Sequence, residues 1–472
     1  MTDLVVSNGR VVTQNDRRRV IPDGAVAVSD GEITQVGPTA EVKAAVTADR
    51  EIDANGGAVI PGLINTHTHV SDILLRGTGT GDRGLYDWLF NIKQPGVFEM
   101  EPEEHALAAR LYCLETISSG TTTFVENDTA LNWDSPATTR HKLDVYREMG
   151  VRSVYGAGIR DRPVDDGFKS KFEDIRARPP ASNHPGPDVL VRDTESVLSA
   201  VDSLIREYHD PTSRQSVWPA PATVATVTTE GLRGAYRLAE THDVMTTTHT
   251  AESEAEARER GALSTVEYLR NIGYLGDRAL LGHCVQTDAR DVRMLARSDT
   301  RVAHNYRANM LLGTGFAPIV AMREAGMTVG IGTDNPMLND TIDALTDADM
   351  AHAAHNGFHR DPGALTAQDA FDMITRDGAA AIGRADDLGS LAVGKRADIV
   401  IVSFDGPHLV PSPDPVHTLI YGANHGDVKT VIIDGEVVMT EGDLGTIVEN
   451  PDAVLAEARE TAVDLAERAG LK

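Results

Sequence analysis

Two patterns of hydrophobic and polar positions divide this chain of 472 residues. Near both ends, short apolar runs are separated by turn signals, and Asp30-Gly31 and Asp434-Gly435 between such runs are typical of β-hairpins. In between, strand-like apolar runs alternate with helical stretches such as residues 103–118 and 252–271. We therefore expect one small β-domain assembled from both ends of the chain and a larger central domain of strand–helix units.

The central region contains eight candidate strands. They end near Thr66, Val125, Ala157, Ala222, Thr248, Gly282, Ala303 and Thr333. Eight strand–helix units predict an α/β fold, a (β/α)₈ TIM barrel, in which the chemistry sits at the C-terminal ends of the strands. The predicted domains are a β-sandwich from residues 1–57 and 387–448, the barrel over 58–386, and a C-terminal helix within 449–472.

Two further segments have recognisable patterns. Residues 168–190 are rich in proline and predict an irregular insertion, and residues 451–469 predict an amphipathic helix on the surface or at a contact between subunits of a homo-oligomer. The apolar runs are far shorter than the roughly 18 residues that cross a bilayer, and the N-terminus lacks the basic start of a secretion signal. These features predict a cytoplasmic protein without a membrane partner.

Composition narrows the classes of function. The formal net charge is -27, and no basic stripe offsets it, so a nucleic acid partner is not expected. Lysine is scarce and the acidic residues are spread over the whole chain, a pattern expected of a halophile-like protein in a salt-rich cytoplasm, although an acidic mesophilic enzyme would look similar. The two cysteines, Cys113 and Cys284, are too few for a disulfide framework or a thiol-rich zinc cluster.

Polar side chains gather at the tips of the candidate barrel strands. They are His67 and His69 on the first strand, His249 on the fifth with Glu252 just after it, His283 on the sixth and Asp334 on the eighth. Any one alone has an ordinary explanation as a strand-end histidine, a helix N-terminal acid or a turn residue. Their joint placement favours a catalytic metal site, because imidazoles and a carboxylate with one open position suit Zn²⁺ or a similar ion.

Motifs along nearly the whole chain resemble those of one protein superfamily. The segments are 61–69 (PGLINTHTH), 74–77 (LLRG), 120–123 (GTTT), 249–252 (HTAE), 282–285 (GHCV), 332–334 (GTD) and 389–400 (GSLAVGKRADIV). They are similar to the amidohydrolase superfamily, in its branch of cytosine, guanine and S-adenosylhomocysteine deaminases and chlorohydrolase-like triazine hydrolases.

The resemblance implies a ligand set and roles for the remaining residues. One divalent metal ion, Zn²⁺ with Fe²⁺ or Mn²⁺ as alternatives, would be bound by His67, His69, His249 and Asp334. Glu252 would shuttle protons, His283 would polarise the attacked centre or orient the water, and Asp334 would also hold the attacking oxygen. Relatives with two metals use a carboxylated lysine on the fourth strand, and this chain has no lysine between residues 171 and 395, which favours a single metal.

The substrate is less sharply defined. The resemblance implies hydrolytic deamination of an amino-substituted heteroaromatic ring, a small-molecule heterocycle of nucleobase, pterin, triazine or nucleoside type. Ala220 and Gln286 stand where S-adenosylhomocysteine deaminases carry histidine, which argues against a nucleoside-specific site. Trp88, Arg307 and Asn309 are candidate substrate-binding residues, with core packing for Trp88 and an ion pair for Arg307 as alternatives.

Two other functions remain open at this point. The same site could hydrolyse another C–N or C–Cl bond on such a ring, by opening a cyclic amide or displacing a triazine substituent. A non-catalytic barrel scaffold is the third hypothesis, and it would predict the loss of metal ligands, which are all present in this sequence.

Overall fold

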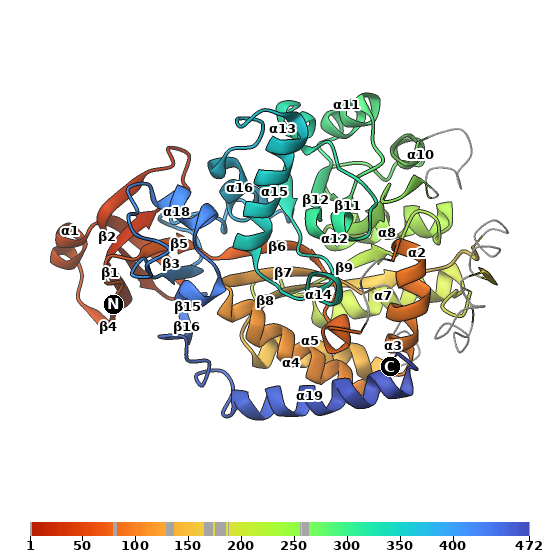
Figure 1. Ribbon diagram of the computed structural model, residues 1–472, viewed down its shortest axis with the longest axis horizontal. Helices are drawn as coiled ribbons and strands as arrows, with labels where there is room; N and C mark the ends of the chain where they lie inside the picture. The colour runs from red at the N-terminus through yellow and green to blue at the C-terminus, as the bar shows by residue number, and fades with distance from the viewer. Residues whose placement is uncertain are drawn as a thin grey trace.

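The computed structural model describes residues 2–78, 83–128, 136–164, 173–174, 186, 188–254, 256 and 264–471. Its larger part is the predicted α/β barrel, and its smaller part is a β-domain at the end that carries the N-terminus (Figure 1). Among these residues, no helix is both long and apolar enough to cross a membrane.

Eight parallel strands form the barrel. They are β6 (Leu63–Thr68), β7 (Thr121–Asn127), β8 (Arg152–Ile159), β9 (Gln215–Pro221), β10 (Thr246–Thr250), β11 (Ala279–His283), β12 (Arg301–His304) and β13 (Val329–Ile331). Hydrogen bonds join neighbouring strands within two sheets, in the orders β6-β7-β8-β9 and β10-β11-β12-β13. Bridges between Thr223 and His249 and between Thr68 and Asp334 close the ring. Nearly all residues of these strands are buried, as expected where helices cover the outside and side chains fill the inside.

Helices follow the strands around the outside of the barrel. They are α4 (Pro102–Ser118), α5 (Pro136–Glu148), α7 (Thr194–Tyr208), α8 (Thr229–His242), α10 (Thr265–Asn271), α11 (Ala289–Arg297), α12 (Tyr306–Leu311), α13 (Ile319–Glu324), α15 (Ala344–His359), α16 (Ala367–Met373) and α17 (Arg376–Ala381). The helix predicted over residues 103–118 is confirmed. The helix predicted over 252–271 is wrong in its extent. The side chain of Ser264 caps α10, which therefore begins as a separate helix at Thr265. Part of the predicted segment lies outside the described residues.

The small domain is one eight-stranded sheet. Its strands are β1 (Thr2–Val12), β2 (Val20–Ser29), β3 (Glu32–Pro38), β4 (Ala48–Asp53), β5 (Ala58–Pro61), β14 (Ile399–Val402), β15 (Val428–Ile433) and β16 (Glu436–Met439). Both chain ends contribute, as predicted. The β2–β3 turn lies against the β15–β16 turn, with Arg396 bridging to Glu32 at 3.7 Å, so the sheet curves around a shared apolar core that includes Val6 and Ile399.

Gly62 marks the passage from one domain to the other. The apolar run before His67 is divided there: β5 pairs with β1 and β14 in the small sheet, and β6 begins the barrel. A Cβ atom on Gly62 would lie 2.2 Å from Oγ1 of Thr122, so only glycine fits this crossing. The small sheet therefore includes residues 58–61, which the sequence pattern had placed in the barrel.

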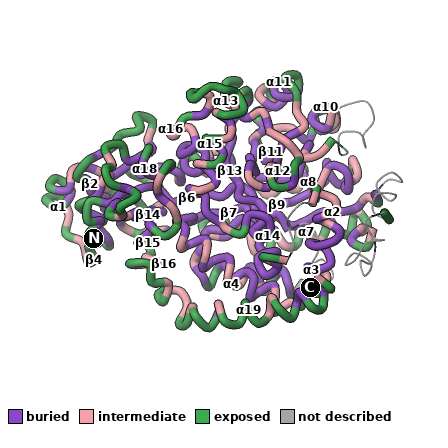
Figure 2. The backbone as a smooth tube through the Cα atoms, viewed as in Figure 1, coloured by how far each residue is buried: buried purple, intermediate pink, exposed green. Residues whose placement is uncertain are grey.

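Short helices and the C-terminal helix complete the molecule. They are α1 (Thr39–Ala45), η1 (Ser71–Leu75), α2 (Leu85–Trp88), η2 (Leu89–Lys93), α3 (Gln94–Phe98), α14 (Pro336–Asn339), α18 (Pro415–Tyr421), η4 (His425–Asp427) and α19 (Pro451–Arg468). Helix α19 forms as predicted and packs along α4 and η1, with its outer side exposed (Figure 2). The insertion predicted over 168–190 lies for the most part outside the described residues.

Candidate active site

Hydrogen bonds between the end of β6 and the turn after β13 bring Asp334 to His67, on β6, and to His69, which directly follows β6. The Asp334 amide donates to the carbonyl oxygen of His67 at 2.9 Å, and the Thr68 hydroxyl donates to the carbonyl oxygen of Asp334 at 2.9 Å. These bonds place Oδ1 of Asp334 3.5 Å from Nε2 of His67 and 3.3 Å from Nε2 of His69. Three of the predicted site residues thus share one centre, which lies at the C-terminal end of the barrel.

His249 joins this centre from the opposite side of the barrel. Its Nε2 atom lies 3.1 Å from Nε2 of His69, while the Nδ1 atoms of His249 and His69 each contact a backbone carbonyl oxygen at 2.7 Å, that of Ala222 and that of Asn127. A neutral imidazole whose Nδ1 donates has a lone pair on Nε2. Among the described residues, the buried Nε2 of His67 has no hydrogen-bond partner. The donor set therefore fits a divalent cation.

Burial and the contacts within the centre favour the protonation states that bind a metal ion, which are neutral imidazoles and an ionised carboxylate. Burial lowers the pKa of His67 to about 4 and that of His249 well below its ordinary value, so both imidazoles are neutral at neutral pH. Burial alone would raise the pKa of Asp334, but its contacts with His67 and His69 outweigh burial and lower that pKa well below the ordinary value. The aspartate is therefore an anion beside the neutral imidazole of His67.

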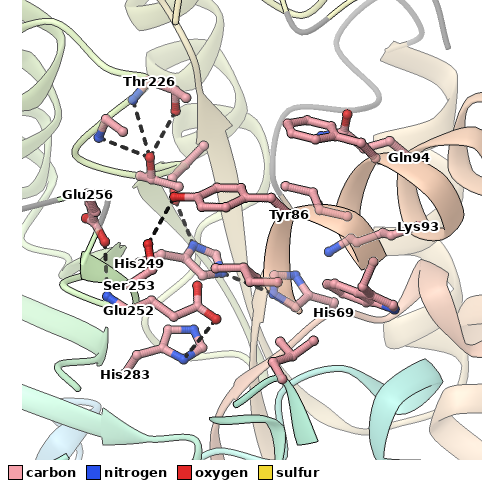
Figure 3. Close-up of a pocket in the computed structure, with 18 of the residues that line it drawn as sticks. His69, Tyr86, Lys93, Gln94, Thr226, His249, Glu252, Ser253, Glu256 and His283 are labelled. Carbon is pink, nitrogen blue, oxygen red and sulfur yellow. Dashed lines mark hydrogen bonds and ion pairs between the residues drawn. The ribbon is translucent and has the colours of Figure 1, made fainter. Parts of the chain in front are cut away.

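Glu252 and His283 lie side by side next to this centre (Figure 3). Oε1 of Glu252 is 3.7 Å from Nδ1 of His283, and that Nδ1 is 2.9 Å from Oδ1 of Asn309. Burial raises the pKa of Glu252; for His283, burial opposes protonation, but Glu252 and Asp334 together outweigh it and raise the pKa. A carboxyl with a raised pKa beside an imidazole is suited to proton transfer.

The strand tips that carry these groups have unusual backbone geometry. Four non-glycine residues there adopt left-handed conformations: Ala251 with φ 50°, His283 with φ 68°, Cys284 with φ 50° and Asp334 with φ 57°. Such conformations are uncommon away from glycine, and they turn the chain sharply where each strand ends. The turns direct the side chains of His283 and Asp334 toward the centre of the barrel mouth.

A cavity opens above these residues, with His69, His249, Glu252, His283 and Asp334 in its wall. Its other walls are largely apolar: Leu85, Tyr86, Trp88, Leu89, Phe90, Leu190, Leu312 and Leu338 contribute to them. Two buried cationic side chains, Lys93 and Arg160, also line the cavity (Figure 3 shows Lys93). A mostly apolar cavity with a few polar groups at one end is typical of a small-molecule site.

The structure places the three predicted substrate-binding residues differently. Trp88 lines the cavity and is also part of the buried core, and its contact with substrate stays a prediction. Arg307 is not among the residues that line this cavity; its Nη1 donates to Thr341 at 2.8 Å and lies 3.7 Å from Asp347, which is the ion-pair alternative. Asn309 is also absent from the cavity wall and contacts His283 instead.

Sequence reasoning missed three residues of the site. Lys93 lines the cavity with its Nζ 3.0 Å from Asp72, Asn305 places Nδ2 3.2 Å from Nε2 of His283, and Glu256 accepts a hydrogen bond from the Glu252 amide at 3.0 Å. Asn305 directly follows β12, and its position at a strand end could have identified it as a candidate site residue. Lys93 lies outside the motifs, and only the scarcity of lysine in this chain points to it.

Comparisons with known proteins agree with this geometry. The family model described as "Amidohydrolase family" matches residues 58–438. A 5-methylthioadenosine/S-adenosylhomocysteine deaminase of Syntrophobacter fumaroxidans is 34% identical, covering 97% of each chain. An S-triazine hydrolase of Gordonia rubripertincta is 30% identical over 100% of this chain and 98% of the relative. The crystal structure of an adenosine deaminase from Xanthomonas campestris with bound zinc superimposes with a TM-score of 0.87 at 27% identity, covering 98% of this chain and 99% of the other.

Proposed function

We propose that this chain, which belongs to the amidohydrolase family, is a metal-dependent hydrolase that deaminates an amino-substituted heteroaromatic ring. It acts on carbon–nitrogen bonds other than peptide bonds. The observation that carries this proposal is the position of Glu252, whose carboxyl group, 12% exposed, lines the cavity 3.7 Å from His283 and beside His67, His69, His249 and Asp334.

The metal centre is assigned to four residues. One divalent ion bound by His67, His69, His249 and Asp334 would lower the pKa of a coordinated water toward about 7. We propose zinc, because three imidazoles and one carboxylate suit this ion and a structural relative contains it. The four residues would hold the ion at the ends of barrel strands, and the contacts of His69 and His249 with backbone oxygens fix the orientation of these two rings.

The remaining residues act on protons and on the substrate. Glu252 takes a proton from the attacking water and delivers it to the amino nitrogen that leaves the ring. His283, whose raised pKa favours its protonated form, donates a hydrogen bond to the ring next to the attacked carbon. Addition of water to this carbon and cleavage of the C–N bond give an oxo-substituted ring and ammonia.

The apolar walls of the cavity bear on the kind of ring. Tyr86, Trp88 and Phe90 offer aromatic surfaces for a flat heterocycle, and leucines surround them. Adenine-type nucleosides and triazines are the two substrate classes that the relatives suggest. The apolar walls favour apolar ring substituents, which keeps the displacement of a triazine substituent as a second candidate for the same site.

Ammonia release separates the two candidates. The purified enzyme is incubated with a panel of purine nucleosides, pterins, pyrimidines and amino- or chloro-triazines, and ammonia, halide and ring-opened acids are measured. We expect ammonia from at least one amino-substituted ring. Halide or ring-opened acid without any ammonia would overturn the deaminase proposal in favour of the second candidate.

We also propose a cytoplasmic enzyme suited to high salt. The support is the formal net charge of -27 together with the scarcity of lysine. Because salt screens repulsion between acidic groups, molar KCl is expected to raise the temperature of unfolding. An unfolding temperature that falls with added KCl would contradict this part of the proposal.

A further inference from the structure

Asn127, the last residue of β7, contacts the outer nitrogen atoms of two of the proposed metal ligands. Its backbone oxygen lies 2.7 Å from Nδ1 of His69, and its side-chain Nδ2 lies 2.9 Å from Nδ1 of His67. Its Oδ1 accepts a hydrogen bond from the hydroxyl of Thr247 on β10 at 3.2 Å. The side chain is buried, so it links three barrel strands beneath the metal centre.

The contact with His67 matters because of where the imidazole proton resides. A neutral imidazole that binds a metal through Nε2 carries its proton on Nδ1, and that N–H needs an acceptor. With the amide nitrogen of Asn127 facing Nδ1, His67 must accept there, and its proton is then on Nε2. In that state Nε2 has no lone pair for a metal ion.

Rotating the side-chain amide of Asn127 by a half-turn exchanges the positions of its oxygen and nitrogen and leaves the shape of the side chain unchanged. Oδ1 of Asn127 then accepts the proton of His67 Nδ1, and the amide nitrogen donates to the oxygen of Thr247. Both states satisfy the buried amide, because the threonine hydroxyl can either donate or accept. The His69 contact is unaffected, since it involves the backbone oxygen of Asn127.

We infer that Asn127 is a positioning residue of the metal centre, whose backbone holds His69 and whose amide selects the proton position of His67. The inference rests on the proposed metal centre and is independent of which ring is the substrate. β7 supplies none of the proposed metal ligands, so its part in the centre is to orient His67, on β6, and His69, directly after β6. Because His67 is fully buried, no solvent water can take the place of the Asn127 amide as the partner of its Nδ1.

Metal affinity tests the inference directly. The dissociation constant of Zn²⁺ is measured by competition with a coloured chelator for the parent, Asn127→Leu and Asn127→Asp, together with the visible spectrum of the Co²⁺-loaded proteins. Leucine keeps the branched shape of asparagine, with two larger methyl groups and no acceptor, and we expect it to weaken Zn²⁺ binding about 10- to 100-fold. The aspartate always accepts from Nδ1, and we expect parent-like affinity and a parent-like Co²⁺ spectrum.

Controls separate this role from general packing. Thr247→Val removes only the third partner of Asn127 and should change Zn²⁺ affinity much less than Asn127→Leu, and Asn127→Ala replaces the leucine variant if that protein does not fold. Parent-like affinity in the variants without an acceptor, or equal losses in the aspartate and leucine variants, would overturn the inference. If the parent itself binds no Zn²⁺, the proposed metal centre fails instead.

Discussion

Nε2 of His69, the residue after β6, faces Nε2 of His249 on β10 at a distance of 3.1 Å, although the two strands belong to different halves of the barrel. The Nδ1 atom of each ring contacts a backbone carbonyl oxygen at 2.7 Å, which leaves a lone pair on each Nε2. Two lone pairs directed at each other are unfavourable unless a cation lies between them. The backbone of the barrel therefore preorganises these two rings to bind a metal ion.

Replacing His67 tests the ligand set. We expect His67→Ala to lose bound metal and activity together, because its Nε2 is directed to the same centre as Asp334, 3.5 Å away. Elemental analysis of purified protein and ammonia release are the two measurements. His359→Ala, at an exposed histidine on α15, serves as the control and should keep both. A full complement of metal in His67→Ala would contradict the assignment.

Replacing Glu252 tests the proton shuttle separately from metal binding. Glu252→Gln keeps the shape of the side chain but cannot carry a proton between water and the leaving nitrogen, so we expect normal metal content and a loss of kcat of about 10²- to 10⁴-fold. The exposed neighbour Glu254 provides the matched control, and Glu254→Gln should keep the parent rate. Equal rates in Glu252→Gln and the parent would remove Glu252 from the mechanism.

The strand ends of this site could be predicted from sequence, and the contacts between neighbouring loops could not. His67, His69, His249, His283 and Asp334 are at predicted strand tips, and barrel topology alone brings such tips together. Asn309 was expected to meet substrate, yet it lies on α12, the short helix that follows β12, and contacts His283 instead. Such contacts depend on how the segment after each strand is oriented, which hydrophobic periodicity and residue propensity do not determine.

The division at Gly62 shows a second limit. Residues on both sides of it are apolar and buried, so the pattern indicates one strand. The break arises because β5 finds its partners in β1 and β14, which are far away in sequence. Pairing with strands from both chain ends is a property of the tertiary fold, and it cannot be predicted from the local pattern of hydrophobic residues.

A buried ion pair near the site leads to a prediction about stability. Lys142 forms an ion pair with Glu126 and lies 3.4 Å from Asp128, and the side chains of Lys142 and Glu126 are both 1% exposed. Lys142→Met leaves two carboxylates without their cation, so we expect the free energy of unfolding in urea to fall by about 3–5 kcal/mol.

An exposed pair provides the control for this experiment. Lys43 and Glu51 also form an ion pair, but their side chains are 44% and 45% exposed. Because water screens such a pair, Lys43→Met should change the free energy of unfolding by less than about 1 kcal/mol. Similar losses in the two methionine variants would mean that burial does not set the contribution of Lys142.

Glu256 gives a prediction for the pH dependence of stability. Burial raises the pKa of its carboxyl from 4.5 to about 8 in the folded protein. Between these pH values the folded state holds a proton that the unfolded chain has released, so stability falls as pH rises, by about 1.4 kcal/mol per pH unit. Glu256→Gln cannot ionise and still offers an oxygen to the amide of Glu252.

The free energy of unfolding of Glu256→Gln, relative to that of the parent, should therefore increase as the pH rises through this window. We expect the difference in the free energy of unfolding, measured in urea at several pH values, to grow in favour of Glu256→Gln from pH 4.5 to about 8 and then to level off. Asp347→Asn offers an independent comparison, because burial raises the pKa of Asp347 to about 8 as well. A difference for Glu256→Gln that does not change with pH would show that Glu256 ionises alike in both states and that burial at this position does not keep the carboxyl protonated.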